Sequence, residues 1–305
     1  MKKVGYLYSD IYLEHVNPPF HPENGERLMS INKGLKEAGL TDKLIHLNPR
    51  KSADEEILTV HDQGYLDMLK RPGEGYLDGD TYKSEGSLEA AYYAAGALLT
   101  ALDAVKEGKI DRAFCAVRPP GHHAERNMAM GFCIFNNVAV AARYGQKLGY
   151  EKACIVDFDV HHGNATQHMF ESDPGVLYIS THQYPHYPGT GANSEIGRGE
   201  GQGFTRNFPM SAGSSDHDYS EVYKKKISPL IKEFSPSIIF ISAGYDLHRN
   251  DPLSSISVST EGIRAIVRTI IDSSPHVPFI VTLEGGYNQN ALSEGVAATI
   301  EELMA

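Results

Sequence analysis

The strongest constraint on the fold is an alternation of short apolar runs with longer segments that carry helical periodicity or are rich in alanine. Short apolar runs predict buried strands, and the longer segments predict helices. The predicted strands are residues 4–8, 112–117, 153–158, 176–180, 238–242 and 278–283. The predicted helices are residues 27–38, 87–107, 137–148, 216–234, 260–272 and 289–304. Pro229 predicts a kink or break in the fourth helix.

Strands that alternate with helices favour an α/β fold. Such a fold has a mostly parallel central sheet, flanked by helices on both faces. The chain shows no internal repeat, low-complexity tract or linker. A single domain over residues 1–305 is therefore expected, and 305 residues are enough to bury a core without disulfides.

Four predicted strands are followed by unusual polar segments. These segments are R-P-P-G-H-H (118–123), D-F-D-V-H-H (157–162), A-G-Y-D (243–246) and E-G-G-Y (284–287). In open parallel sheets, ligands bind outside the carboxyl ends of the strands. The four segments are therefore expected to form one site. The longest irregular stretch, residues 181–203, is rich in Gly, Pro, Tyr and His and is also expected to be functional.

The second polar segment suggests a metal site. Asp157, Asp159 and His161 alternate with apolar residues, so in an extended chain they share one face. Asp159 and His161, with Asp246 from another strand end, would give a catalytic zinc three ligands and leave one position open. The short motif also resembles the metal sites of arginase-like hydrolases, which hold two manganese ions. Manganese or iron suits such an oxygen-rich site, and an exposed polar strand end without metal is the alternative.

Two further groups suggest acid–base chemistry. His122 and His123 follow two prolines and a glycine, which predicts a stiff turn carrying two imidazoles suited to proton transfer near neutral pH. Tyr287 follows Gly285-Gly286, and its phenol could donate a hydrogen bond to a developing oxyanion. Taken alone, a histidine pair in a loop is usually surface decoration, and Gly-Gly-Tyr is usually a turn followed by a packed aromatic residue.

Charge and cysteine content limit the partners and the compartment. The net charge of −11 disfavours direct nucleic-acid binding and could attract cationic substrates. The three cysteines (Cys115, Cys133 and Cys154) show no C-x-x-C spacing, which favours a reducing compartment. No signal peptide or segment long enough to cross a bilayer is evident. A cytoplasmic protein without a membrane partner is expected.

Taken together, these motifs resemble the histone deacetylase family, which includes acetylpolyamine amidohydrolases and bacterial deacetylase-like enzymes. The likeness runs from H-P-E-N-G-E-R-L (21–28) to Asn288, nearly the whole chain. Its motifs are R-P-P-G-H-H-A (118–124), G-F-C (131–133), D-F-D-V-H-H-G-N (157–164), P-G-T-G (188–191), A-G-Y-D (243–246), D-P-L (251–253) and L-E-G-G-Y-N (283–288). The resemblance implies the arginase/deacetylase α/β fold and one catalytic Zn²⁺.

The resemblance also implies catalytic roles. Asp159, His161 and Asp246 match the zinc ligands, and His123 matches the general base and acid. His122 matches its electrostatic partner, held by Asp157. Asn164 matches the residue that orients His123, where class I relatives have Asp and class II-like members have Asn. Tyr287 matches the carbonyl-polarising tyrosine.

Further positions match substrate and ion contacts. Gly131, Phe132 and Tyr187 match the walls of the acyl-lysine tunnel, and Asp80 matches the rim acid that holds the substrate backbone. A structural K⁺ site is implied by Asp157, Asp159, His161, Ser180 and Thr181. Leu253 stands where dedicated polyamine deacetylases can carry Glu, which disfavours selection for a second ammonium group.

The sequence therefore predicts a zinc-dependent amidohydrolase that deacylates lysine side chains, of class II-like type. Deacetylation of acetylpolyamines or other small acylated amines is one alternative. A catalytically inactive module that binds acyl-lysine is another. The acyl length, the choice between zinc and iron, and the oligomeric state stay open.

Overall fold

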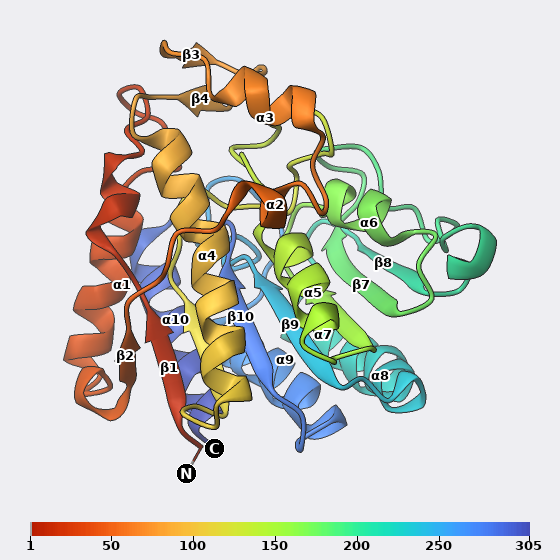
Figure 1. Ribbon diagram of the computed structural model, residues 1–305. Helices are drawn as coiled ribbons and strands as arrows, with labels where there is room; N and C mark the ends of the chain where they lie inside the picture. Colours follow the sequence, from red (N-terminus) through yellow and green to blue (C-terminus); the bar gives the residue numbers. More distant parts are fainter. Residues whose placement is uncertain (1) are drawn as a thin grey trace.

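The computed structural model describes residues 2–305, which form an α/β domain around an eight-stranded parallel sheet (Figure 1). The strand order across the sheet is β2-β1-β5-β10-β9-β6-β7-β8. The strands are β1 Val4–Leu7, β2 Ile45–Leu47, β5 Arg112–Cys115, β6 Ala153–Asp157, β7 Val176–Gln183, β8 Thr205–Met210, β9 Ile238–Ala243 and β10 Phe279–Leu283. A separate antiparallel hairpin joins β3 (Gly75–Tyr76) to β4 (Tyr82–Lys83). The predicted fold class is confirmed.

All six strands predicted from apolar runs are present, and every residue in them is buried. The sequence did not predict the two edge strands, β2 and β8, because each is only partly buried and so lacks a continuous apolar run. Strand β7 continues to Gln183, so the irregular stretch expected from residue 181 begins later.

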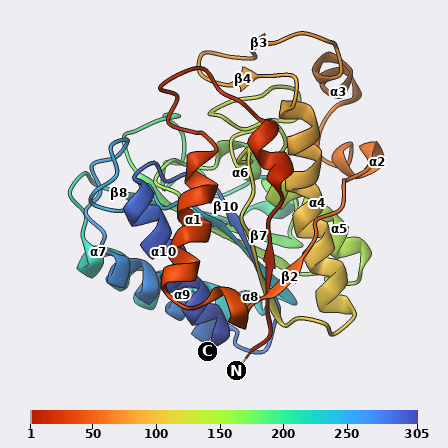
Figure 2. The ribbon, with the colours of Figure 1, turned by 90° about the vertical axis from the view of Figure 1, so that its left-hand side faces the viewer.

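Helices cover both faces of the sheet (Figure 2). Figure 2 shows α1, α9 and α10 on one side of the sheet and α4 and α5 on the other. The helices are α1 Glu26–Glu37, α2 Asp54–Ile57, α3 Gln63–Leu69, α4 Ser87–Lys106, α5 Asn137–Lys147, α6 Asn164–Phe170, α7 Asp216–Val222, α8 Ser228–Phe234, α9 Thr260–Ser273 and α10 Gln289–Met304.

The break predicted near Pro229 takes the form of a π-helical segment, Tyr223–Ile227, between α7 and α8. Pro229 lies in the first turn of α8, where its missing N–H matters least. The wider π turn comes just before it and separates the proline ring from the preceding carbonyls. The regular α-helix is therefore interrupted just before Pro229, because the proline ring would clash with the carbonyls of the preceding turn.

The strand order brings the four polar segments together. They follow β5, β6, β9 and β10, and these four strands are neighbours in the sheet in the order β5-β10-β9-β6. All are parallel, so their carboxyl ends lie at one edge. The predicted convergence of the segments is confirmed.

Two other expectations concern compartment and membrane. Cys115, Cys133 and Cys154 are buried and free. Among residues 2–305, no helix is both long enough and apolar enough to span a membrane.

Candidate active site

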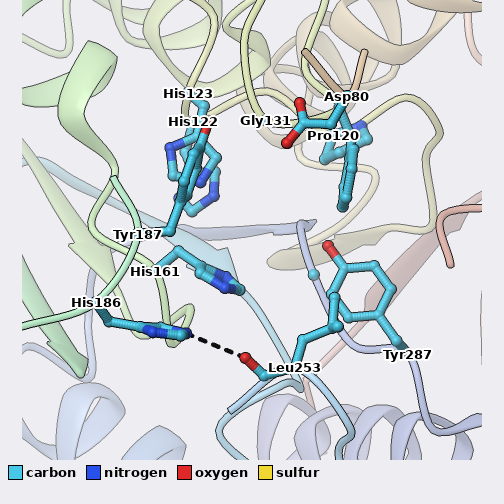
Figure 3. Close-up of a pocket in the computed structure, with 12 residues that line it drawn as sticks. Asp80, Pro120, His122, His123, Gly131, His161, His186, Tyr187, Leu253 and Tyr287 are labelled. Atoms are coloured by element: carbon cyan, nitrogen blue, oxygen red, sulfur yellow. Dashed lines mark hydrogen bonds between the residues drawn. The ribbon is translucent and has the colours of Figure 1, made fainter. Parts of the chain in front are cut away.

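A cavity of about 190 Å³ opens at the carboxyl ends of the central strands (Figure 3). The residues that line it are Asp80, Pro120, His122, His123, Gly131, Phe132, His161, His186, Tyr187, Leu253, Gly285 and Tyr287. Nine of these were predicted as site residues from the sequence. The other predicted catalytic and metal-binding residues, Asp157, Asp159, Asn164 and Asp246, lie behind them and contact the histidines of the wall.

The three predicted metal ligands meet beside the cavity. The Nδ1 atom of His161 lies 3.1 Å from Asp159 Oδ1 and 3.1 Å from Asp246 Oδ2. Potential ligand atoms of the three residues all lie within 4.8 Å of one another. Asp246 comes from the loop after β9, and the other two come from the loop after β6. Residues 87 positions apart in the chain thus form one group.

The prediction that Asp157, Asp159 and His161 share one face of an extended strand is wrong. Strand β6 ends at Asp157, and the chain then bends. Asp157 Oδ1 accepts the backbone N–H of Asp159 at 3.1 Å, and Asp159 Oδ1 accepts that of His161 at 2.9 Å. Side-chain oxygens that bond to the backbone two residues on are typical of turns. After the bend, Asp157 pairs with His122, whereas His161 faces Asp246.

The residues present fit a divalent metal ion. Asp159 Oδ2 accepts the N–H of Gly285 at 2.8 Å, and Asp246 Oδ1 accepts that of Val160 at 3.0 Å. The backbone thereby orients both carboxylates while their other oxygens face His161. A Cβ atom on Gly285 would lie 2.2 Å from Asp246 Oδ2, so glycine is needed for this approach. Two carboxylates and one imidazole are ligands that a catalytic zinc uses.

The charges of this group also favour a cation. Burial and the neighbouring Asp159 raise the pKa of the Asp246 carboxyl to about 7, although His161 opposes the shift. Burial alone would lower the pKa of His161, but the two carboxylates raise it to about 10. Two buried carboxylates this close are costly unless positive charge lies between them.

The two histidines of the R-P-P-G-H-H loop have different partners. His122 Nδ1 lies 3.1 Å from Asp157 Oδ2, and His123 Nδ1 lies 2.7 Å from Asn164 Oδ1. Asn164 in turn donates from Nδ2 to Glu125 Oε1 at 2.6 Å, which fixes its amide so that the oxygen faces His123. An amide oxygen only accepts, so His123 carries its proton on Nδ1. Its Nε2 is then free to accept a proton.

The pKa values of the two rings move in opposite directions. Burial opposes charging of His122, but Asp157, Asp159 and Glu284 raise its pKa to about 10. Burial and the charges of His122 and His161 hold the pKa of His123 well below its usual value. One ring is therefore a fixed positive charge, and the other is neutral at pH 7.

Tyr287 is held at the opposite wall by residues that the sequence analysis did not identify. Its N–H donates to Asp251 Oδ2 at 2.6 Å. Arg27 donates to the carbonyls of Glu284 and Gly286 at 2.6 and 2.7 Å, and its guanidinium lies 5.1 Å from the centre of the Tyr287 ring. Burial raises the pKa of the phenol well above its usual value, although Arg27 opposes the shift. Tyr287 therefore stays protonated and can donate.

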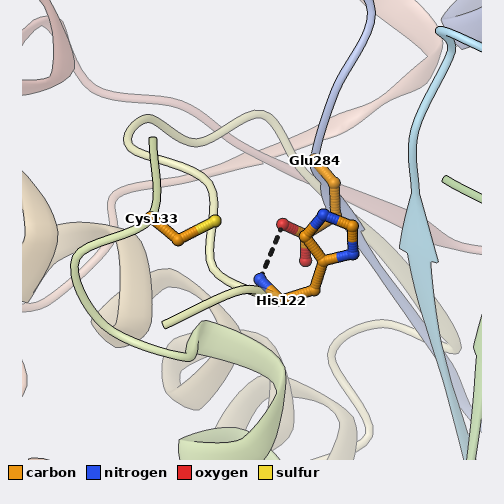
Figure 4. A group of neighbouring side chains, drawn as sticks. All are labelled: His122, Cys133 and Glu284. Atoms are coloured by element: carbon orange, nitrogen blue, oxygen red, sulfur yellow. Dashed lines mark hydrogen bonds between the residues drawn. The ribbon is translucent and has the colours of Figure 1, made fainter. Parts of the chain in front are cut away.

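Glu284 supports the histidine loop through hydrogen bonds to its backbone (Figure 4). Its Oε2 accepts the N–H groups of Gly121 at 2.7 Å and His122 at 3.2 Å, and its Oε1 accepts the Ser242 hydroxyl at 3.0 Å. Burial raises the pKa of this carboxyl to about 7, although the charge of His122 opposes the shift. Glu284 begins the E-G-G-Y motif (284–287), in which only Tyr287 was predicted to have a role.

The cluster of His122, Cys133 and Glu284 could in principle hold a metal, because the three residues bring ligand atoms together. However, Glu284 is saturated by backbone and serine donors, and the Cys133 thiol donates to the Gly131 carbonyl at 3.3 Å. Burial raises the pKa of that thiol well above its usual value, which disfavours the thiolate that a metal needs. We interpret the cluster as support for His122.

The walls of the cavity are mostly aromatic and apolar. The Phe132 ring lies 5.9 Å from that of Tyr287, and the Tyr187 ring lies 5.2 Å from that of His123.

Phe132 has a φ of 68°, and its N–H donates to Thr81 Oγ1 at 2.9 Å. Before it, Gly131 has a φ of 55°, and a Cβ there would lie 2.5 Å from the His123 ring. The glycine therefore permits the tight turn that aims Phe132.

The remaining predicted substrate contacts lie where the sequence placed them. Asp80 sits in the turn between β3 and β4, and Leu253 follows Asp246 on the same loop. Both line the cavity. His186, which the sequence analysis missed, stacks on His161 at 5.1 Å and lies 3.1 Å from the Leu253 carbonyl through Nε2. It falls inside the Gly-, Pro-, Tyr- and His-rich stretch, which was the only signal for it.

The residues of the predicted K⁺ site are neighbours. Strand register pairs Asp157 with Ser180, and Asp159 and His161 follow Asp157 directly. The Thr181 hydroxyl lies 3.0 Å from that of Tyr223, so the backbone carbonyl is the group this residue could offer.

With the fold and the site described, comparison with known proteins identifies the family. Residues 21–303 match the family model of the histone deacetylase domain. The sequence is 38% identical to a probable deacetylase of Archaeoglobus fulgidus over 291 residues, which cover 93% of this chain and 81% of that protein. It is 39% identical to histone deacetylase 15 of Arabidopsis thaliana over 93% of this chain and 53% of that protein.

A solved structure agrees. The crystal structure of the HDA15 HD domain matches with a TM-score of 0.95 at 37% identity, covering 99% of this chain and 88% of that chain. The chain therefore belongs to the histone deacetylase family, as its motifs indicated. It spans about half the length of the plant relative histone deacetylase 15.

Proposed function

We propose that this protein is a zinc-dependent deacetylase that hydrolyses the side-chain amide of acylated lysine. The observation that carries the proposal is the group of Asp159, His161 and Asp246, which lies next to a neutral His123 in a narrow aromatic cavity. Membership of the histone deacetylase family supports the reaction class. The complete set of catalytic residues argues against the alternative of an inactive acyl-lysine binding module.

The geometry supports a direct hydrolytic mechanism. Zinc at the three ligands would polarise the amide carbonyl and activate a water. His123 Nε2 accepts the proton of the attacking water, and the resulting imidazolium returns it to the leaving amine. The Tyr287 hydroxyl donates a hydrogen bond to the oxyanion of the tetrahedral intermediate. The positive His122 adds favourable charge beside it, and no covalent enzyme intermediate is needed.

Leu253 supports lysine over polyamine as the substrate. It lines the cavity with an apolar side chain. A second ammonium group of a polyamine would lie unpaired beside that side chain, which is costly. The half-buried carboxyl of Asp80 lines the cavity and is available for the backbone of a peptide, as the family resemblance implies.

We also propose a structural K⁺ near Asp157 and Ser180, and a cytoplasmic location. The register of β6 and β7 supports the first, and the three buried free cysteines support the second. Thermal unfolding in matched KCl and tetramethylammonium chloride buffers tests the ion: potassium binding to the folded state raises the melting temperature.

The function is tested with an acetyl-lysine peptide and acetylspermidine, each with and without a chelator. We expect the peptide to be hydrolysed. The chelator should abolish this hydrolysis, and added zinc should restore it. Preferential hydrolysis of acetylspermidine would replace lysine with polyamine as the substrate. Tight binding of the peptide without hydrolysis would identify a binding module instead.

Replacing Tyr287 with Phe is expected to lower kcat by about 10²–10³, because one oxyanion donor is lost while the ring stays. The phenol does not belong to the metal group, so bound zinc should be unchanged. Steady-state kinetics and metal analysis of the same preparation measure both quantities. Wild-type turnover in this variant would remove Tyr287 from the mechanism.

A further inference from the structure

The exposed large hydrophobic side chains of residues 2–305 are concentrated near the active site. They are Val16, Phe20, Met29, Tyr76, Met128 and Tyr187. Val16 donates its N–H to Ser84 Oγ at 3.0 Å, outside the cavity lining, and Met29 lies on α1. The other four belong to segments that line the cavity or contact its lining. We call Phe20, Tyr76, Met128 and Tyr187 the apolar rim. Scattered exposed hydrophobics need no explanation, but a group around a ligand site indicates an interaction surface.

The contacts of each segment place the rim around the mouth. Phe20 precedes His21, whose ring packs on Phe132 at 4.7 Å. Tyr76 lies on β3, and the turn from β3 to β4 carries Asp80. Met128 lies on the loop between His123 and Gly131, and Tyr187 lines the cavity directly. Figure 3 shows Tyr187 and Asp80 on different sides of the pocket, so Tyr187 lies across the opening from the turn that connects β3 and β4.

Phe20 is the most unusual member. Its side chain is fully exposed, at 105% of the reference area, and its φ is 69°. A bulky residue with a positive φ is strained, and the fold gains no packing from this ring. Strain of this kind persists only where the surroundings impose it. Pro18 and Pro19 precede the residue and Pro22 follows His21, so the backbone is stiff on both sides.

Buried ion pairs anchor the base of this loop. His21 Nε2 donates to the Asp80 carbonyl at 3.1 Å, and its Nδ1 accepts the N–H of Glu23 at 3.2 Å. Glu23 is fully buried and pairs with Arg118 and, at 3.2 Å, with Arg27. These contacts fix the backbone next to Phe20 and leave its ring exposed to solvent. An aromatic side chain has few rotatable bonds, so ordering it on binding costs little entropy, which is typical of a recognition residue.

We infer that the apolar rim, and Phe20 above all, binds an apolar side chain next to the acyl-lysine of a polypeptide substrate. This inference rests on the proposed function. The cavity admits only the acylated side chain, so the neighbouring residues of the polypeptide lie across the mouth, against Phe20 and Tyr76. Asp80 lines the cavity, and its carboxyl, 3.4 Å from the Thr81 hydroxyl, would accept backbone N–H groups of the same segment. A small acylated amine would leave these rim side chains uncovered.

The test compares two acetyl-lysine peptides that differ only in the residues flanking the acetyl-lysine, which are leucine in one and serine in the other. The wild-type kcat/KM should favour the leucine peptide by about tenfold, the effect of partly burying an aliphatic side chain. Phe20→Asn should bring this ratio close to one, because asparagine tolerates the positive φ but offers no apolar surface. Phe20→Tyr should keep the ratio.

Met29→Ser is the matched control, because Met29 is also exposed but lies on α1 away from the cavity. It should keep both the ratio and the activity. Thermal unfolding of each variant verifies that it is folded. Equal kcat/KM for both peptides in the wild type, or a ratio retained in Phe20→Asn, would overturn the inference.

Two other results have distinct meanings. Sedimentation showing a dimer that Phe20→Asn dissociates would assign the rim to a second copy of this chain and overturn the inference. If neither peptide nor acetyl-lysine methylamide is hydrolysed, the proposed function fails as well. If acetyl-lysine peptides are hydrolysed without any preference for the flanking residues, the inference about the apolar rim fails while the proposed function stands.

Discussion

Replacing Asp246 with Asn is expected to remove most of the bound zinc and nearly all deacetylase activity. The Asp246 carboxylate supplies half of the negative charge that faces His161, and Asn keeps the acceptor for the Val160 N–H while losing that charge. Loss of a Lewis acid removes several kcal/mol of transition-state stabilisation, which corresponds to about a thousandfold or more in rate. Elemental analysis of the purified variant measures the metal, and peptide turnover measures the activity.

The stability of this variant should not fall in parallel. A buried carboxylate beside another is costly without its metal, so metal-free Asp246→Asn should unfold at a temperature equal to or above that of metal-free wild type. Asp251→Asn is the matched control, because Asp251 lies on the same loop but accepts the N–H groups of Tyr287 and Asn288 instead. It should keep its zinc. Full zinc occupancy in Asp246→Asn would show that Asp246 is not a ligand.

The convergence of the site could be predicted from sequence because it depends on local patterns and one topological rule. Strands buried on both faces read as continuous apolar runs, and the polar segments that end them are conspicuous. Parallel strands then bring those segments to one edge. The edge strands escaped prediction for the same reason: β2 and β8 are partly exposed, so their composition resembles that of a loop.

The residues that support the site could not be predicted, because their partners are distant in the chain. Arg27 bonds to backbone carbonyls 257 and 259 positions away, and Glu284 bonds to the backbone at Gly121, 163 positions away. Charged residues are usually exposed, so nothing in the local sequence indicates that these two are buried. The local sequence does not indicate the role of Glu125 either, because that role is to accept the Asn164 amide N–H and so depends on how the Asn164 side chain is oriented. Local periodicity carries no information about such pairs.

The bend after β6 shows a second limit. The strand is predicted to end at residue 158, but alternation of polar and apolar residues suggests an extended chain through residue 161. The buried Phe158 and Val160 agree with that pattern. The carboxylates of Asp157 and Asp159 nevertheless bond to the backbone two residues on and turn the chain. Because these side chains compete for backbone donors, the chain turns so that His161, a predicted metal ligand, faces Asp246 while Asp157 pairs with His122.

The two histidines are expected to contribute unequally to catalysis. His123→Ala should lower kcat/KM by about 10²–10⁴, the usual effect of losing a general base, while zinc stays bound. His122→Ala should lower kcat/KM on the order of tenfold, which corresponds to a change of about one unit in the pKa of His123. The reason is the difference in their partners: Asp157 and Asp159 favour a charged His122, whereas Asn164 leaves His123 neutral with Nε2 free.

Asn164 allows a sharper form of the same prediction. Asn164→Asp would place a carboxylate 2.7 Å from His123 Nδ1, the contact that its amide oxygen makes now. A carboxylate there favours the charged ring, so the pKa of His123 should rise. The acidic limb of the kcat/KM profile should then move to higher pH, because more protons must be removed before His123 can act as a base. Peptide hydrolysis from pH 5 to 9 in wild type, Asn164→Asp and His122→Ala measures this. If His122→Ala is less active than His123→Ala, or if the Asn164→Asp profile does not move, the general base is not His123.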